Sequence, residues 1–407
     1  MRREAFSNSP LRPSLTPRSW DVFCRVVDNF GDAAVCWRLA RGLAALDPPP
    51  TVRLWIDHLD VLRALVPELS PEPSRQAWDG VQVLRLNEEA DFGTPADVAV
   101  DAFGCGLPDA YVHAMAARSL EYGARPLWVL LEYLSAEPWV AAHHGLPSPH
   151  PRLPLERYFF FPGFDAQTGG LLREPGLDAR RQAFLADPEQ PAALWRDAGF
   201  DPPAGKLVTL FGYENAPVDA LLDAWVRGAE PVVAAVPASR LEPGVAAFMG
   251  AAGTDPNVLT GRSLRRGSLE VRFLPFLPQE RYDELLWSAH WNFVRGEDSF
   301  VRAQWAERPF VWQLYPQAEN AHIAKLEAFL ELYCSGLDAA LAAPLRSLFR
   351  AWNGAPGSGG ADLELAWASL SRSEDELRRH ARRWASQLVA AGDLVMKLAK
   401  FCSERLK

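Results

Sequence analysis

Several features that would assign this chain to a common class of protein are missing from its sequence. Its 407 residues include five cysteines and no C-x-x-C pair, which favours neither a disulfide framework nor a zinc site. No apolar run approaches the roughly 18 residues that span a bilayer. Residues 1–20 carry charge and proline but no apolar core of a secretory signal. The sequence therefore predicts a cytoplasmic protein that does not enter a membrane.

Positive charge is also scarce. Lys and Arg total 42 against 51 Asp and Glu, so the formal net charge is −9. Broad binding to nucleic-acid phosphates needs a basic surface, and nucleic acid is therefore not expected as a partner. The densest basic stretch holds Arg262, Arg265 and Arg266 in GRSLRRG, and we interpret it as a solvated loop.

The common fingerprints of nucleotide and metal sites are absent or incomplete. No Walker A lysine motif is present, which counts against a P-loop NTPase. The stretch FGCGLPDA at 103–110 has G-x-G without the third glycine, so an NAD-dependent enzyme is disfavoured. No HExxH motif or paired histidines suggest a metal, and no G-x-S-x-G suggests a serine nucleophile.

What the sequence does contain is a regular alternation of apolar, strand-like segments with helical patterns. This alternation predicts βαβ units and parallel sheets. The predicted strands are 22–27, 52–56, 81–86, 98–103, 126–134 and 157–164 in the first half, and 206–215, 231–237, 271–277, 291–296 and 309–316 in the second. The predicted helices are 33–46, 109–122, 217–227, 279–289, 299–307 and 319–333. Two doubly wound domains place their ligands at the carboxyl ends of strands, which makes the cleft between them the expected site.

The length suits two domains of ordinary size. We expect a mobile tail at 1–19, a first Rossmann-like domain at 20–180 and a second at 181–373. The Gly-rich stretch 353–362 is expected to be a surface loop. Residues 374–407 form an amphipathic helical pattern that could cross back to the first domain.

Two carboxylates stand at the first strand-to-helix turn, in Asp-Asn-Phe-Gly-Asp at 28–32. Gly31 permits a tight turn, and Asp32 is well placed as the N-cap of the following helix. Asp28 ends an apolar strand, where a carboxylate without a partner is costly to desolvate. The simplest interpretation is a strand end and a helix cap. Alternatively, the pair grips a cation, or one of them acts as a general base.

A second polar cluster follows the strand WNFV. Ser299 can cap the next helix, whose first N–H groups attract phosphate. Arg295 suits bidentate contact with phosphate, while Glu297 and Asp298 could accept hydrogen bonds from ribose or sugar hydroxyls. The alternative is a helix cap with a surface ion pair between Arg295 and Glu297. Four polar groups at the carboxyl end of one strand favour a binding site.

Aromatic residues gather at the predicted strand ends of the second half. Rings at such places can sandwich a base, and the amide of Gln279 could read a pyrimidine edge, although core packing explains each ring taken alone. The rings belong to Phe211, Tyr213, Phe276, Tyr282 and Tyr315. In the first half, LEYLSAEPW at 131–139 places aromatics beside carboxylates, which suits either a protein-binding rim or a strand that runs into a loop.

Five segments together resemble the EarP family, the bacterial protein-arginine rhamnosyltransferases that mature elongation factor P (EF-P). They are DNFGDAAVCWRLAR, LEYLSAEPW, LFGYEN, FLPQERYDELLW and RGEDSFVRAQWAERPFVWQLYPQ, in the family's order. Ala33-Ala34 stands where the family often has Ile-Gly. The resemblance implies a GT-B glycosyltransferase without metal or cofactor, whose two Rossmann-like domains face a cleft. It also implies transfer of rhamnose from dTDP-β-L-rhamnose to an arginine of EF-P, with inversion at the anomeric carbon.

The same resemblance implies roles for individual residues. Asp28 and Asp32 match acceptor-side carboxylates, with Asp32 as the base, and Glu297 matches a residue needed for turnover. The acceptor protein would dock on the segment that contains Glu132, Tyr133 and Glu137. The positions around the donor nucleotide and sugar are matched by Phe211, Tyr213, Phe276, Gln279, Arg295, Asp298, Ser299 and Tyr315.

Two other functions stay open on the sequence. Another GT-B transferase would act on a small molecule or a glycan, and such an acceptor would not require the acidic pair together with LEYLSAEPW. A non-catalytic EF-P-binding protein would show no thermal shift with dTDP.

Overall fold

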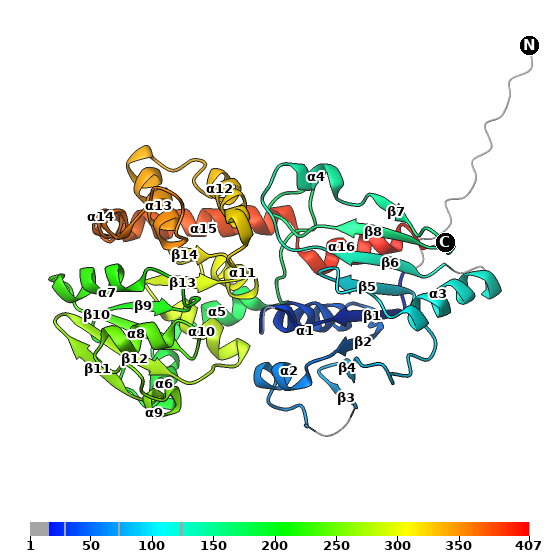
Figure 1. Cartoon of the computed structure of the whole chain (residues 1–407), viewed down its shortest axis with the longest axis horizontal. Coiled ribbons are helices and arrows are strands. Elements are labelled where there is room, and N and C mark those ends of the chain that lie inside the picture. Colours follow the sequence, from blue (N-terminus) through cyan, green and yellow to red (C-terminus); the bar gives the residue numbers. More distant parts are fainter. Residues whose placement is uncertain (1–15, 28–29, 72–73, 123–124, 407) are drawn as a thin grey trace, which may run out of the picture.

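The structure is a computed structural model that describes residues 16–27, 30–71, 74–122 and 125–406. It contains two α/β lobes that lie side by side (Figure 1). The expected tail at 1–19 falls mostly outside the described residues, and so does Asp28. No helix in the described part of the chain is both long and apolar enough to cross a bilayer.

The N-terminal lobe is built on an eight-stranded sheet. Its elements are β1 (Ser19–Cys24), α1 (Phe30–Ala44), β2 (Thr51–Ile56), α2 (Leu59–Leu65), β3 (Arg75–Trp78), β4 (Val81–Arg85), β5 (Val98–Ala102), α3 (Asp109–Tyr122), β6 (Leu127–Leu131), α4 (Trp139–His143), β7 (Pro147–Pro149) and β8 (Glu156–Phe160). The strand order is β3-β4-β2-β1-β5-β6-β8-β7. The six central strands in this order are parallel to one another, and β3 and β7 pair antiparallel at the two edges. Both β5 and β6 are buried along their whole length, which explains their continuous apolar sequences.

The C-terminal lobe repeats this plan on a six-stranded sheet. Its elements are α5 (Leu177–Ala186), α6 (Glu189–Asp197), β9 (Lys206–Leu210), α7 (Val218–Arg227), β10 (Val232–Pro237), α8 (Glu242–Phe248), α9 (Pro256–Leu259), β11 (Ser263–Arg266), β12 (Leu269–Leu274), α10 (Gln279–Ser288), β13 (Trp291–Arg295), α11 (Asp298–Trp305), β14 (Phe310–Gln313), η1 (Ala318–Asn320), α12 (Ala321–Tyr333), α13 (Ala339–Trp352), α14 (Gly360–Leu370) and α15 (Glu374–Ala391). The strand order is β11-β12-β10-β9-β13-β14, with only β11 antiparallel among the described strands. The predicted pair of doubly wound sheets is confirmed.

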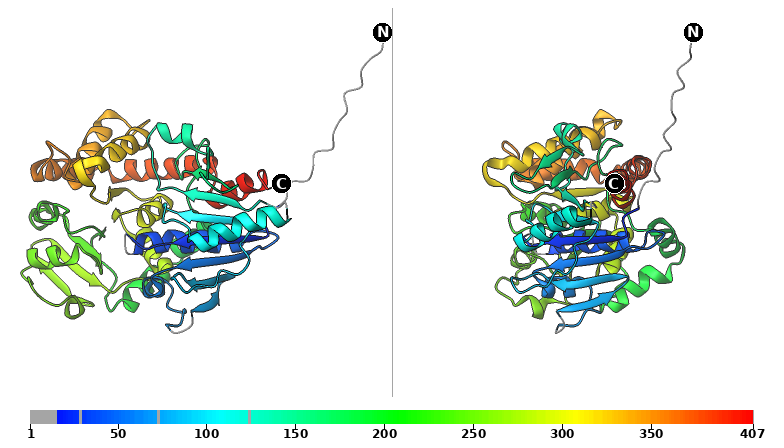
Figure 2. Two further views of the ribbon diagram at one scale, coloured as in Figure 1. Left: turned by 45° about the vertical axis from the view of Figure 1, so that its right-hand side comes forward. Right: turned by 90° about the vertical axis from the view of Figure 1, so that its right-hand side faces the viewer.

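The C-terminal end of the chain returns to the first lobe. Helix α15 packs in the C-terminal lobe, and α16 (Leu394–Ser403) packs against α1 in the N-terminal lobe (Figures 1 and 2). The two connections between the lobes touch, because Leu394 N donates to Leu171 O at 3.0 Å. Gly170 has φ +74°, and a Cβ there would lie 2.2 Å from Gly392 O, so this close crossing requires glycine.

Two local expectations were wrong. The GRSLRRG stretch is not a loop, because Ser263–Arg266 forms the edge strand β11. Its exposed arginines are typical of a strand edge that avoids pairing with another chain. The predicted first strand ends earlier than expected, at Cys24, and the following helix also begins earlier, at Phe30.

Candidate active site between the lobes

Each sheet reverses its winding direction at one point, and doubly wound proteins bind ligands there. In the N-terminal lobe the reversal lies between β1 and β5, and in the C-terminal lobe between β9 and β13. The segments after β1 and β13 meet in the cleft, since α1 packs against α11. The cleft between the lobes is therefore lined by the turns that the sequence singled out.

Asp32 lies in the first turn of α1, not at its N-cap as predicted, because α1 begins at Phe30 and not at residue 33. Its carboxylate Oδ2 accepts a hydrogen bond from Val27 N at 2.9 Å. The side chain is buried, and it lines a cavity between the lobes. A carboxylate in a first helical turn is favoured by the positive end of the helix dipole.

The turn from β13 into α11 depends on Gly296, whose φ of +61° suits glycine. Ser299 does not cap the helix: its hydroxyl accepts from Arg295 N and donates to Arg295 O. Arg295 is buried, with its guanidinium carbon 4.7 Å from the ring centre of Phe211 and 4.5 Å from that of Tyr213. Because Arg295 is buried, the alternative of a surface ion pair with Glu297 is wrong.

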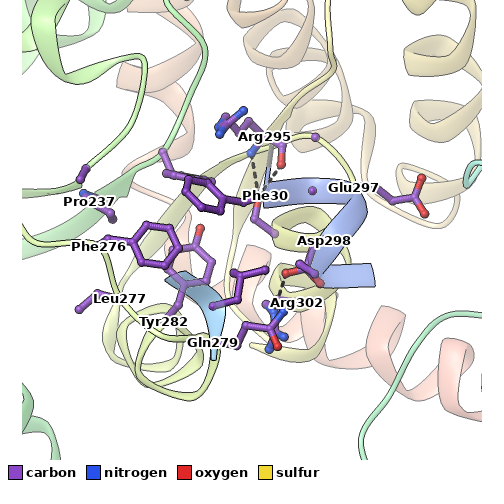
Figure 3. A pocket seen from close by; sticks show the side chains of 17 residues that line it. Phe30, Pro237, Phe276, Leu277, Gln279, Tyr282, Arg295, Glu297, Asp298 and Arg302 are labelled. Atoms are coloured by element: carbon purple, nitrogen blue, oxygen red, sulfur yellow. Dashed lines mark hydrogen bonds and ion pairs between the residues drawn. The ribbon is translucent and has the colours of Figure 1, made fainter. Parts of the chain in front are cut away.

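An aromatic pocket lies beside this turn (Figure 3). Phe276 from the C-terminal lobe and Phe30 from α1 line it and pack against each other, with ring centres 4.6 Å apart. The side chain of Gln279 is buried, and its Nε2 has no hydrogen-bond partner among the described residues. The predicted residues that line this pocket are Phe211, Phe276, Gln279, Tyr282, Arg295, Glu297, Asp298 and Ser299. Apolar rings with one unsatisfied buried amide fit a flat, polar-edged ligand such as a base.

A second, larger cavity adjoins the first, and both are lined by Gly31, Gly296 and Glu297. Asp32 and Tyr133 line it from the N-terminal lobe, and its other predicted lining residue is Tyr315. We call it the acidic cavity, because it adjoins Asp32 and Glu297. Tyr213 lies beneath Arg295 and contacts the edge of Tyr315, with ring centres 5.5 Å apart.

Glu297 connects the two lobes at the junction of the pockets. Its Oε2 accepts from Leu134 N at 2.9 Å, in the segment after β6. Figure 3 shows its side chain extending away from the aromatic rings. Burial raises the pKa of Glu297 to about 8, and the charges of Asp32 and Asp298 add to this, while the Leu134 N–H and Lys325 oppose it.

The LEYLSAEPW segment forms one rim of the acidic cavity. Tyr133 is exposed and stacks on Phe103 at 4.4 Å, and both rings line the cavity. Glu132 is half-buried, and burial raises its pKa, with a further contribution from Asp101. Glu137 accepts from Ser135 Oγ at 3.0 Å. Of the three predicted acceptor-binding residues in this segment, Tyr133 is the one that lines the cavity, and the fourth, Asp28, lies outside the described residues.

A buried ion-pair network that the sequence analysis missed lies behind α11. Arg38 on α1 donates from Nη1 to Asp298 Oδ1 at 2.8 Å, and Arg302 donates from Nε to Asp298 Oδ2 at 2.9 Å. Arg302 also donates to Asp283 at 2.9 Å. Asp298 thus holds two arginines rather than pointing only at the pocket. Its spacing of four residues from Arg302 on one helix was the available sequence signal.

Other lining residues carried no signal in the sequence. Phe30 falls within the acidic motif at 28–32, yet nothing local predicts that it would meet Phe276. Lys325 lines the acidic cavity from α12, together with the buried His322. Among the described residues, no group of three or more His, Cys, Asp or Glu side chains is arranged to hold a metal ion.

Two Rossmann-like lobes that face a shared cleft define the GT-B glycosyltransferases. The family model described as Elongation-Factor P (EF-P) rhamnosyltransferase EarP matches residues 20–403, and the chain belongs to this family. The predicted family and fold class are therefore confirmed.

Similar proteins cover nearly the whole chain. The protein-arginine rhamnosyltransferase of Pseudomonas putida is 44% identical over 384 residues, which are 94% of this chain and 98% of the relative. That of Pseudomonas aeruginosa is 43% identical over 390 residues, 95% and 100% of the two chains. A solved structure described as the structural basis for EarP-mediated arginine glycosylation of translation elongation factor EF-P has a TM-score of 0.65 and 33% identity, and covers 95% of this chain and 99% of that chain.

Proposed function

We propose that this protein transfers rhamnose from dTDP-β-L-rhamnose to one arginine of EF-P, with inversion at the anomeric carbon. The observation that carries the proposal is the meeting of an aromatic pocket and an acidic cavity at Glu297. In a member of this family, the first suits the nucleotide of the donor and the second suits a guanidinium. Because EF-P acts in translation, the proposed place of reaction is the cytoplasm.

In this proposal the thymine lies between the rings of Phe211 and Phe276, and Gln279 donates from Nε2 to a base carbonyl. A buried amide N–H without a partner costs about 1–3 kcal/mol, and a ligand that accepts from it would recover that cost. The diphosphate lies near the start of α11, where Arg295 and the first N–H groups of the helix stabilise the charge that develops as it leaves.

The acceptor guanidinium enters the acidic cavity between Asp32 and Glu297. Free arginine stays protonated, with a pKa above about 12, and is a poor nucleophile. Charge-assisted hydrogen bonds to carboxylates hold it and orient one nitrogen. As that nitrogen bonds to the anomeric carbon, the bond from this carbon to the diphosphate breaks, and Asp32 accepts the proton that the nitrogen loses. A single displacement of this kind inverts a β-linked donor to an α-linked product.

The Gln279→Leu variant tests the base pocket. We expect dTDP to bind about tenfold more weakly, because one hydrogen bond to the base is lost. The free variant should melt no lower than the wild-type protein, since leucine removes an unsatisfied buried amide. Isothermal titration calorimetry and thermal melting measure the two effects. Unchanged dTDP affinity would remove Gln279 from the donor site.

The Lys325→Met variant tests the electrostatics of the acidic cavity. Lys325 opposes the raised pKa of Glu297, so its removal should move that pKa further upward. We expect the rise of kcat/KM for EF-P with pH to shift to higher pH by about half a unit. The matched control is Lys400→Met, an exposed lysine on α16. An unshifted profile for Lys325→Met would contradict this role.

The activity itself is tested by mass spectrometry of EF-P after incubation with the protein and dTDP-β-L-rhamnose. The expected result is a gain of one deoxyhexose on one arginine, with an α-linked product by NMR. EF-P in which that arginine is replaced by lysine is the matched control. Unmodified wild-type EF-P would favour a GT-B transferase with another acceptor. Unmodified EF-P together with no thermal shift by dTDP would favour a binding protein.

A further inference from the structure

The guanidinium of Arg38 links its own helix, α1, to two other segments of the molecule. It lies on α1 of the N-terminal lobe, and Nη1 donates to Asp298 Oδ1 at the start of α11 in the C-terminal lobe. Its Nε and Nη2 donate to the two carboxylate oxygens of Glu174 at 2.5 and 2.9 Å, and Nη2 also donates to Leu172 O at 3.2 Å. Leu172 and Glu174 belong to the first connection between the lobes. The side chain of Arg38 is 1% exposed.

Both oxygens of Asp298 are engaged in this way, since Arg302 donates to the second one. The first residue of α11 is therefore fixed from its own helix by Arg302 and from the other lobe by Arg38. Glu297 directly precedes it and reaches across to Leu134. Any shift of Asp298 relative to α1 would move Glu297 relative to Asp32, because Asp32 and Arg38 stand on the same helix.

Stability alone is a weak reason for such a network. Burying ion pairs costs desolvation that their attraction often only offsets, so apolar residues of similar size stabilise a fold as well. What ion pairs add is direction: the planar guanidinium fixes two partners in a defined geometry, which lysine does not do. Although burial would raise it, the pKa of Glu174 lies well below its usual range because of Arg38 and Arg302, so the pair stays charged at neutral pH.

We infer that Arg38 is a positioning residue for glycosyl transfer, which sets the start of α11 in the donor lobe against Asp32 in the acceptor lobe. The inference rests on the proposed function, because it assigns the alignment of acceptor and donor to this contact. The aromatic pocket consists mainly of residues of the C-terminal lobe that Arg38 does not touch. Loss of Arg38 therefore affects the chemical step far more than nucleotide binding.

The test measures kcat for EF-P rhamnosylation and the Kd of dTDP in Arg38→Met and Arg38→Lys. We expect kcat to fall about tenfold or more in Arg38→Met, since a misplaced reacting group costs at least that much. The Kd of dTDP should stay within about threefold of wild type, because Asp298 is the only one of the Arg38 partners named here that lines the aromatic pocket, and Arg302 still holds it. Arg38→Lys keeps the charge but loses the planar guanidinium that bonds two partners at once, so its kcat should lie between those of wild type and Arg38→Met.

The matched control is Arg181→Met, which removes another buried arginine, one on α5 that contacts the other end of α11. Arg181 donates to Trp305 O at the end of α11 and pairs with Glu307 just beyond it, so its loss also breaks an ion pair next to this helix. We expect Arg181→Met to lower the melting temperature and to leave kcat within twofold.

Three outcomes would overturn the inference. The first is a wild-type kcat in Arg38→Met, or in Arg38→Lys if the methionine variant does not fold. The second is an equal loss of kcat in Arg181→Met. The third is a wild-type protein that does not modify EF-P, which would overturn the proposed function as well; the first two outcomes leave that function intact.

Discussion

Asp32→Asn should lower kcat for EF-P rhamnosylation by about 100-fold to 10,000-fold, the range that a general base contributes. Asparagine has nearly the same shape, and its carbonyl can still accept from Val27 N, so the helix start should remain intact. What is lost, in the proposed mechanism, is the negative charge that holds the guanidinium and the site that accepts its proton. The Kd of dTDP should not change, because Asp32 does not line the aromatic pocket.

The structure offers a closely matched control for this variant. Asp57 follows β2 and accepts from Val26 N at 3.0 Å, one residue before the amide that Asp32 accepts from. Asp57→Asn makes the same chemical change beside the same turn, and we expect its kcat to stay within twofold of wild type. Initial rates from mass spectrometry compare the two. A rate in Asp32→Asn equal to that in Asp57→Asn would exclude Asp32 as the base.

The second large effect concerns pH and Glu297. Because the pKa of this carboxyl group is raised to about 8, it is mostly neutral at pH 7 in the free protein. A guanidinium binds an ionised carboxylate much better than a neutral one. We therefore expect kcat/KM for EF-P, which reports on the free enzyme, to rise about tenfold per pH unit below pH 8 and to level off above it.

Glu297→Gln should abolish this rise and lower kcat/KM by about 10- to 100-fold at pH 8.5, while its amide oxygen can still accept from Leu134 N.

The same substitution should raise the stability of the protein at high pH, although it lowers activity. The folded-state pKa of Glu297, about 8, exceeds the unfolded value of about 4.3. The stability that protonated Glu297 contributes is therefore fully present below pH 4.3 and is lost as pH rises through 8. The glutamine variant should thus melt higher than wild type at pH 8, by about 2 °C or more. A glutamine variant that keeps the wild-type pH profile of kcat/KM would contradict the first expectation, and one that melts no higher than wild type at pH 8 would contradict the second.

Much of the fold was predictable because buried parallel strands leave a strong pattern. The continuous apolar segments of β5 and β6 are buried on both faces, and their sequences alone indicated strands. The edge strands β3, β7 and β11 were missed because they are short, mostly exposed and polar or proline-rich. Edge strands need only one neighbour, so they carry little apolar pattern.

The site was predictable to the extent that it is local. Polar residues after β13 and rings after β9 lie at strand ends that any doubly wound sheet brings to one edge. The contact of Arg38 with Asp298 joins residues 260 positions apart, and no spacing rule predicts such a pair. The N-cap assignments of Asp32 and Ser299 were wrong because each helix begins before the expected residue.

The touching glycines at 170 and 392 have a mechanical consequence. The two connections between the lobes run side by side there, and Leu394 N bonds to Leu171 O. The two connections therefore form one crossing point at the end of the cleft. An opening of the lobes about that point would widen access for the nucleotide and for the protein substrate together.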